Sequence, residues 1–259
     1  MRVLTALIAI LLTALPWLAP AADQKIRVRV VDFAPNYFRQ DGRWVGLDVE
    51  LAEAVVKEAG LQIEFMELPW SRALAYMQSG GVDLMANLSR SADREAYIHF
   101  FGPERVSKRV LVVRKESAGM KINTLDDLLT AARQAKMPFG IQKDANYSGA
   151  FDARLVADPV FASAFEAVVV GAQLPKKVAG FHNLGFFEDA NYVAYQIKRS
   201  SDFESLVRHP FTLSNEPVYF GVSRHLDAAT VASLEAAFKR LEKNGKLAKI
   251  RQAWGGGGQ

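Results

Sequence analysis

Residues 69–94, PWSRALAYMQSGGVDLMANLSRSADR, carry in succession the patterns of a helix, a strand and a polar loop. Ser71 is suited to cap a helix whose apolar residues recur at helical spacing, and Gly80 is suited to end it. Residues 82–86 form a short apolar run that is typical of a buried strand. The polar residues that follow are therefore predicted to leave the end of a strand.

The same alternation precedes this stretch. Residues 26–30 alternate as in a strand with one buried face, residues 48–59 have the spacing of an amphipathic helix, and residues 63–65 form a second strand. The order indicates a mostly parallel sheet covered by helices, which binds ligands beyond the carboxyl ends of its strands. Three loops are expected to share that edge: residues 32–37, 69–70 and 87–94.

A second α/β unit follows. Thr124 and Asp127 resemble a capping box in front of a helix, and another helix is expected to begin near Tyr147. Residues 174–187 have no regular pattern and are predicted to be an irregular, aromatic-rich connection. The remaining predicted elements are strands at 109–114, 138–142 and 217–222 and helices at 227–244 and 246–254.

The composition narrows the possible functions. The 259 residues include no cysteine, which excludes disulfides, thiolate nucleophiles and cysteine-based metal sites. The four histidines are far apart in the sequence, and this spacing disfavours a zinc site. Lys and Arg are scattered rather than clustered, so no nucleic-acid-binding face is predicted despite a net charge of +4. We expect a monomer without a cofactor.

The N-terminus has the pattern of a signal peptide. Met1 and Arg2 give a positive start, residues 3–15 are almost wholly apolar, and residues 19–21 fit the small-x-small cleavage rule. The apolar run is too short to cross a hydrocarbon core of about 30 Å comfortably, although a retained membrane anchor is the alternative. We predict cleavage after Ala21, with residues 1–21 removed, and a soluble protein of the periplasm.

Four motifs, in order along nearly the whole mature chain, resemble those of the family 3 periplasmic solute-binding proteins, known from amino-acid ABC transporters. The first is Gly46-Leu47-Asp48 before a helix, and the second is Pro69–Leu74 with Gly81-Val82-Asp83. The third is Ser91–Arg94 followed by Phe100–Pro103, and the last runs from Leu241–Gly245 to Trp254-Gly255.

The resemblance implies a periplasmic binding protein fold of two α/β lobes, each a mostly parallel sheet flanked by helices. Carried onto this chain, lobe one is residues 23–107 plus 216–258, and lobe two, inserted between them, is residues 108–215. Two crossovers would form a hinge at which the lobes close around ligand. The implied function is capture of a small polar ligand with a carboxylate, an amino acid above all, for a membrane ABC permease.

The resemblance also assigns site residues. Arg94 matches the family's carboxylate-binding arginine, and a guanidinium can hold a carboxylate with two parallel hydrogen bonds. Asn87 and Ser89 are expected to offer polar groups to the same carboxylate. Asn146, at the start of a lobe-two helix, is expected to add a donor.

Aromatic residues are expected to complete the pocket. Trp70, Phe33 and Tyr37 are predicted apolar walls, with a place in the core as the alternative for each.

The partner for a ligand ammonium is less clearly defined. The family's lobe-two acid falls at Asn191, with Asp189 or Glu188 as substitutes in another register. An Asn cannot offset the desolvation of a buried cation as a carboxylate can, so a ligand with a carboxylate and no amino group fits nearly as well.

Two other functions stay open. Some proteins that resemble this fold are periplasmic dehydratases of prephenate-like substrates, and Glu188 or Asp189 could serve as the acid. However, no Gly-x-Ser-x-Gly elbow, phosphate loop or histidine-based metal motif is present, so we expect no enzyme. The other alternative is an accessory or sensor protein that binds a protein partner.

Overall fold

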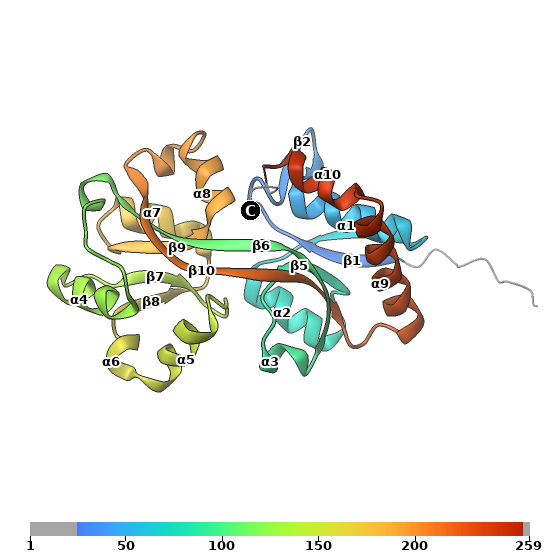
Figure 1. Cartoon of the computed structure of the whole chain (residues 1–259), viewed down its shortest axis with the longest axis horizontal. Coiled ribbons are helices and arrows are strands. Elements are labelled where there is room, and N and C mark those ends of the chain that lie inside the picture. The colour runs from blue at the N-terminus through green and yellow to red at the C-terminus, as the bar shows by residue number, and fades with distance from the viewer. Residues whose placement is uncertain (1–24, 256–259) are drawn as a thin grey trace, which may run out of the picture.

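The computed structural model describes residues 25–255, and the predicted signal peptide lies outside them. Figure 1 shows two lobes side by side, crossed by two long neighbouring strands. These strands are β6 (Ile98–Arg114) and β10 (Leu206–Ser223), and they pair in antiparallel fashion across both lobes. All strands except β2 and β3 therefore join one sheet, in the order β4-β1-β5-β10-β6-β9-β7-β8.

Lobe one, at the right of Figure 1, contains both ends of the described chain. Its strands are β1 (Lys25–Val30), β2 (Phe38–Gln40), β3 (Arg43–Val45), β4 (Gln62–Glu67) and β5 (Leu84–Leu88). Its helices are α1 (Leu47–Glu58), α2 (Trp70–Ser79), α3 (Ala92–Glu95), α9 (Ala228–Lys243) and α10 (Lys246–Ala253). β1 lies between β4 and β5 and is parallel to both.

Strand β5 is apolar throughout its first half because both of its faces are covered. Leu84 and Ala86 belong to the core beneath α1 and α9, whereas Met85 packs with α2 on the opposite face. Alternate residues of a strand point to opposite faces, so one short run serves two cores. This arrangement leaves the polar residues after β5 at the end of the sheet.

Lobe two, at the left of Figure 1, has a second parallel group of strands. The strands are β7 (Phe139–Gln142), β8 (Phe165–Val168) and β9 (Gly185–Asp189). The helices are α4 (Leu125–Ala135), α5 (Gly149–Ala157), α6 (Pro159–Ala162), α7 (Leu174–Ala179) and α8 (Ala190–Ile197). β7 is parallel to β8 and β9, and β9 is antiparallel to β6.

The predicted two-lobed α/β architecture is confirmed, with two adjustments of detail. The capping box of Thr124 and Asp127 is present at α4. The predicted cap Ser71 is wrong, because α2 begins at Trp70 and Pro69, two residues earlier, occupies the N-cap position. The segment 174–187, predicted to be irregular, contains α7 and the first residues of β9.

The predicted lobe boundaries fall inside the two crossing strands. Ser107 pairs with Glu216 and Lys108 with Asn215, so the two proposed division points face each other in one ladder. The division of the chain at these positions stays a prediction.

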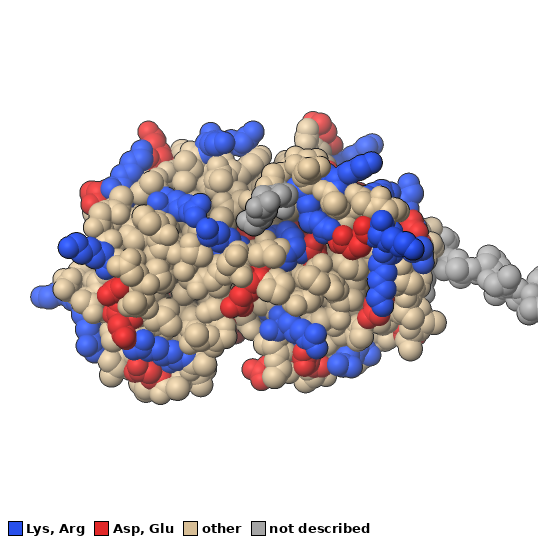
Figure 2. All heavy atoms as spheres, viewed as in Figure 1, with Lys and Arg blue, Asp and Glu red and all other residues tan. Residues whose placement is uncertain are grey.

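The surface of both lobes carries mixed charge. On the face in Figure 2, Lys and Arg side chains are interspersed with Asp and Glu side chains, and a notch separates the lobes at the lower edge. None of the helices within residues 25–255 has the length and apolar composition needed to cross a membrane.

Candidate functional site

A cavity of about 190 Å³, here called the aromatic cavity, lies between the lobes. From lobe one its lining includes Arg29, Asp32, Phe33, Tyr37, Trp70 and Asn87. From β6 and lobe two its lining includes Arg109, Gln142, Tyr147, Phe186, Glu188 and Tyr192. The three loops predicted to share one edge of the sheet all contribute to this lining, so their predicted meeting is confirmed.

The predicted aromatic walls contact lobe two as well as the cavity. Phe33 stacks on Tyr192, with ring centroids 4.2 Å apart and planes within 7°. Trp70 donates from Nε1 to the main-chain oxygen of Asp144 over 3.0 Å. Tyr37 is buried, and its hydroxyl has no hydrogen-bond partner among residues 25–255. All three rings line the cavity, and Phe33 and Trp70 also join the lobes, while their contact with a ligand stays a prediction.

Arg94 does not line the aromatic cavity but lines a second pocket between the lobes. This wide pocket has a volume of about 940 Å³ and is also lined by Ser89, Asn146 and Asp152. The Arg94 side chain donates from Nη1 to the carbonyl of Ser89 over 3.0 Å and from Nη2 to the carbonyl of Asp144 over 2.9 Å. Two donors of its guanidinium are thus taken by main-chain oxygens, one of them in lobe two.

Asn87 is the predicted polar contact that does line the aromatic cavity. Its backbone is left-handed, with φ of 60°, a conformation that Asn tolerates better than most residues. Its main-chain N–H donates to the Glu104 carboxylate over 2.9 Å. Its side-chain oxygen is buried and has no hydrogen-bond partner in the described part of the chain.

Asn146 was predicted to add a donor at the start of α5. Backbone N–H groups there already donate to side chains of lobe two. Tyr147 donates its N–H to the Asp152 carboxylate over 3.0 Å. Phe151 donates its N–H to the Ser148 hydroxyl over 3.2 Å. Asn146 itself borders the wide pocket.

The three candidate partners for a ligand ammonium occupy different surroundings. Glu188 lines the aromatic cavity and accepts from Arg109 Nη1 over 2.7 Å. Burial raises the pKa of Glu188, and the positive charge of Arg109 opposes that rise. Asp189 instead caps α8, and Asn191 donates its N–H to that cap over 2.9 Å. Among these residues, only Glu188 is part of the cavity lining.

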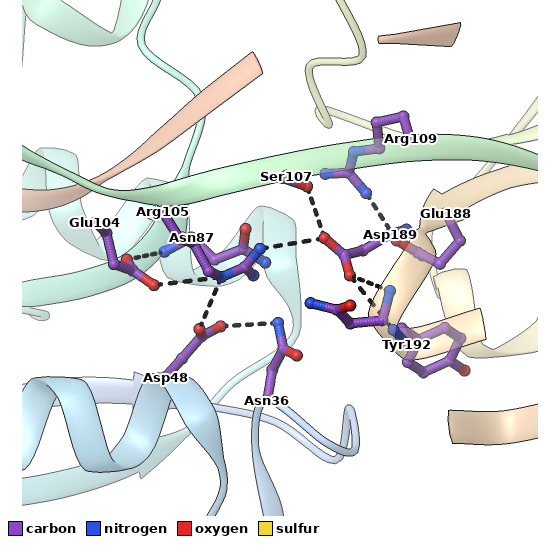
Figure 3. Close-up of polar contacts among 11 residues, drawn as sticks. Asn36, Asp48, Asn87, Glu104, Arg105, Ser107, Arg109, Glu188, Asp189 and Tyr192 are labelled. Atoms are coloured by element: carbon purple, nitrogen blue, oxygen red, sulfur yellow. Dashed lines mark hydrogen bonds and ion pairs between the residues drawn. The ribbon is translucent and has the colours of Figure 1, made fainter. Parts of the chain in front are cut away.

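A buried charge cluster lies where β6 passes between the lobes (Figure 3). We call it the hinge cluster and define it as Asp48, Glu104, Arg105 and Asp189. Arg105 Nε is 3.4 Å from Asp48 and 3.6 Å from Glu104, both of lobe one, and Arg105 Nη1 is 3.2 Å from Asp189 of lobe two. Ser107 donates its hydroxyl to Asp189 over 2.7 Å. One guanidinium thus joins carboxylates from both lobes.

The cluster changes the titration of its acids. Burial opposes ionisation of Asp189, but Arg105 and the Ser107 hydroxyl outweigh it, so the pKa of Asp189 is lowered. Burial, and then the neighbouring carboxylate of Asp48, raise the pKa of Glu104 well above its usual range. A raised pKa means that Glu104 holds a proton where an exposed glutamate would be ionised.

The structure adds site residues that the sequence patterns did not single out, among them Arg29, Arg109 and Tyr147. Arg29 is in the strand 26–30, where apolar and polar residues alternate. This alternation predicts that Arg29 points away from the core, but it does not predict that Arg29 is buried. Arg109 begins a predicted strand and faces an acid 79 residues away. Neither position carries a local signal for a site.

Comparison with known proteins supports one family. The sequence profile of the bacterial extracellular solute-binding proteins, family 3, matches residues 26–257. A probable histidine-binding protein of Neisseria gonorrhoeae is 26% identical over 243 residues, which are 90% of this chain and 84% of that protein.

Solved structures share the fold. A histidine kinase sensor domain with similarity to periplasmic binding proteins has a TM-score of 0.74 and 21% identity, covering 89% of this chain and 95% of that one. An ancestral amino-acid-binding protein, a precursor of cyclohexadienyl dehydratase, has a TM-score of 0.70 and 21% identity, again covering 89% and 95%. At these identities the likeness concerns the fold alone, and the predicted periplasmic binding protein fold is confirmed.

The raised pKa of Glu104 predicts a pH-dependent stability difference. The folded state keeps a proton that an unfolded glutamate releases near pH 4.3, so the free energy of unfolding falls as pH rises above about 4.3. Glu104→Gln removes this titration. We expect the free energy of unfolding of the variant, relative to wild type, to increase with pH above that point, by at most about 1.4 kcal/mol per pH unit, until the pH reaches the pKa of Glu104 in the folded protein.

Urea denaturation at intervals from pH 4.5 to pH 8 measures the difference. Glu204→Gln, at an exposed position, is the matched control and is expected to follow wild type at every pH. Parallel curves for wild type and Glu104→Gln would contradict the prediction.

Proposed function

Because this chain belongs to the bacterial extracellular solute-binding proteins, family 3, we propose that it captures a small ligand with a carboxylate, an amino acid or a related acid, between its lobes. The observation that carries the proposal is the aromatic cavity, whose lining comes from both lobes. A ligand in that position contacts both walls only when the lobes are together. Its binding energy therefore favours the closed arrangement.

The size of the cavity supports a ligand of amino-acid size. Its volume of about 190 Å³ is below the 300 Å³ or so at which pockets for larger ligands begin. Six aromatic side chains in the lining offer flat apolar contacts: Phe33, Tyr37, Trp70, Tyr147, Phe186 and Tyr192.

The charges in the lining support a ligand that itself has opposite charges. Arg29 and Arg109 are cationic, whereas Asp32 and Glu188 are acidic. A zwitterion can place its carboxylate against a guanidinium and its ammonium against a carboxylate. The relative from Neisseria gonorrhoeae is named a probable histidine-binding protein, which also supports an amino acid here.

Ligand capture is tested by thermal unfolding of the mature protein against a panel of L-amino acids, dicarboxylates and aromatic keto acids. A ligand at 100 times its Kd stabilises the native state by about 2.7 kcal/mol. For a chain of this size the melting temperature should rise by about 5–10 °C. No shift with any member of the panel would contradict the proposal.

Two variants on α2 test whether the stabilising ligand binds in the aromatic cavity. Trp70→Ala removes a wall of the cavity and its bond to Asp144, and we expect its Kd for the stabilising ligand to rise about tenfold or more, or 1.4 kcal/mol. Tyr76→Ala, on the same helix but 37% exposed, is expected to keep the wild-type Kd. Equal effects of the two variants would place the ligand elsewhere.

We also propose that the protein works in the periplasm and delivers its ligand to a membrane ABC permease. The extracellular designation of the family and the predicted signal peptide support this location. Immobilised, ligand-loaded protein is expected to retain an ABC permease from detergent-solubilised membranes. Retention of another exported protein in its place would favour the accessory function.

An enzymatic function is the second candidate, because one structural neighbour is a dehydratase precursor and Glu188 is a buried acid in the cavity. A glutamate with a raised pKa is suited to proton transfer. Its Oε1, however, accepts hydrogen bonds from Arg109 and from the Asp189 N–H. We propose that the acid fixes the cavity wall and that bound ligand is not converted.

Incubation with prephenate tests this part of the proposal. We expect the formation of phenylpyruvate to proceed at the rate seen without protein. Formation that is faster by tenfold or more, and that Glu188→Gln abolishes, would show that the protein is an enzyme.

A further inference from the structure

Arg29 is a buried cation with few partners. Its side chain, on a residue only 6% exposed, donates from Nε to the carbonyl of Leu68 over 3.1 Å. Among residues 25–255, no other hydrogen bond and no carboxylate within 4 Å engages this side chain, whereas the buried Arg105 and Arg114 each have such a carboxylate. Both terminal nitrogens of Arg29 therefore have no acceptor in the described chain.

The nearby acid Asp48 does not fill this need. Burial lowers the pKa of Arg29 because the charge has lost its hydration, and the more distant charge of Asp48 opposes that fall only in part. The two carboxylate oxygens of Asp48 already accept from Arg105 Nε over 3.4 Å and from Asn36 Nδ2 over 3.0 Å. The guanidinium of Arg29 is thus left to find an oxygen acceptor outside the described chain.

The same guanidinium lines the aromatic cavity. Its carbon Cζ is 5.8 Å from the ring centroid of Tyr37 and 5.4 Å from that of Trp70. The hydroxyl of Tyr37 is also buried on this cavity and has no hydrogen-bond partner within residues 25–255. Burial raises the pKa of Tyr37, so the hydroxyl keeps its proton and can donate it to an acceptor. Two buried donors without acceptors therefore lie on one cavity.

The other charged groups in the cavity lining are compensated or exposed. Arg109 donates from Nη1 to Glu188 over 2.7 Å, so each of these side chains offsets the charge of the other. Asp32 is exposed, and water screens its charge far more than that of the buried Arg29. Buried polar groups without partners are uncommon in folded proteins, and each carries a desolvation cost. The uncompensated charge of the lining is thus the positive charge of Arg29.

Arg94 provides a second guanidinium close to the first. The wide pocket, which Arg94 lines, and the aromatic cavity share Ala145 in their linings. The Cζ atoms of Arg94 and Arg29 lie 5.5 and 5.4 Å from the ring centroid of Trp70. Nε of Arg94 makes no hydrogen bond in the described chain, so this guanidinium has donors to spare beside its two main-chain bonds. A ligand of amino-acid size with two acidic groups can therefore contact both arginines.

From these contacts we propose that Arg29 binds an acidic group at the end of the ligand's side chain, and that the ligand is an acidic amino acid or a related dicarboxylate. The inference rests on the proposed function and names its class of ligand. Arg94 keeps the main carboxylate, which the family resemblance assigns to it. The second acidic group accepts charge-assisted hydrogen bonds from Arg29 and a hydrogen bond from Tyr37. Side chains that end in a cation are disfavoured, because they bring a like charge to Arg29.

The test compares acids with side-chain amides of the same shape by calorimetry on the mature protein. The pairs are L-glutamate with L-glutamine, L-aspartate with L-asparagine, and succinate with succinamate. For the most tightly bound pair, wild type is expected to prefer the acid by about 100-fold, the scale of a buried charge pair. L-Arginine, whose side chain has the same charge as Arg29, is expected to bind more weakly than either member of that pair.

Variants at position 29 identify the group that distinguishes acid from amide. In Arg29→Gln the preference should fall to within about threefold, because the charge that distinguishes the two ligands is gone. Arg29→Lys keeps a positive charge but not the planar pair of donors, and we expect it to retain a preference of about tenfold. The ratio of the two Kd values is the readout, because a general weakening of the fold changes both values together.

Two further variants serve as controls. Arg39→Gln replaces an exposed arginine of the same lobe and is expected to keep both Kd values of wild type. Arg94→Gln removes the partner of the carboxylate that acid and amide share. Both Kd values should therefore rise together in Arg94→Gln, and the preference for the acid should stay.

The outcomes separate this inference from the proposed function. Equal affinity for acid and amide, or binding confined to ligands without a second acidic group, would overturn the inference and leave the proposed function intact. A preference that survives in Arg29→Gln, or that is lost in both position-29 variants, would overturn the assignment to Arg29. A wild type that binds no amino acid, dicarboxylate or keto acid would instead remove the proposed function, and this inference with it.

Discussion

Arg105 is a buried arginine at the point where β6 passes from lobe one to lobe two, and it contacts carboxylates of both. Removing one partner of such a buried pair typically costs 3–5 kcal/mol, because the remaining charge is left without compensation. The geometry of the two lobes therefore depends on this contact. Asp48 at the start of α1 and Asp189 at the start of α8 are held to one side chain (Figure 3).

The hinge cluster also reaches the cavity wall. Asp189 accepts from Arg105 with one oxygen and caps α8 with the other, where it accepts the N–H of Tyr192 over 3.3 Å. Tyr192 in turn stacks on Phe33 from the other lobe. On the lobe-one side, Glu104 accepts the N–H of Asn87, which lines the same cavity. A bend at the crossing strands would therefore move both walls, which is what capture between lobes requires.

Much of the fold could be predicted because the spacing of apolar residues along the sequence indicates where helices and strands form. The helix 48–59 and the strand 63–65 follow from apolar spacing, and they appear as α1 and β4. The length of β6 and β10 was not predictable in this way, because both continue through prolines and polar residues that belong to the hinge. Likewise β9, buried along its whole length, has no alternation to mark it.

The candidate site was predictable in part. The loops that line the cavity follow from the rule that parallel strands present their carboxyl ends at one edge, and Trp70 and Asn87 lie there. The hinge cluster was not predictable, since Asp48, Arg105 and Asp189 are 57 and 84 positions apart and meet only through the sheet. Whether a guanidinium lines a cavity also depends on tertiary contacts. The sequence motif therefore identifies Arg94 as a candidate, whereas no sequence pattern identifies Arg29, which lines the cavity.

The proposed function requires that a ligand be bound between lobes that close upon it. Because the chain has no cysteine, Ser79→Cys on α2 and Val160→Cys on α6 provide two unique exposed positions for spin labels, one on each lobe. Pulsed electron paramagnetic resonance then measures the distance between lobes. We expect a broad distribution without ligand and a single, shorter distance at saturating ligand. The same distribution in both conditions, with binding shown by calorimetry on the labelled protein, would contradict the claim.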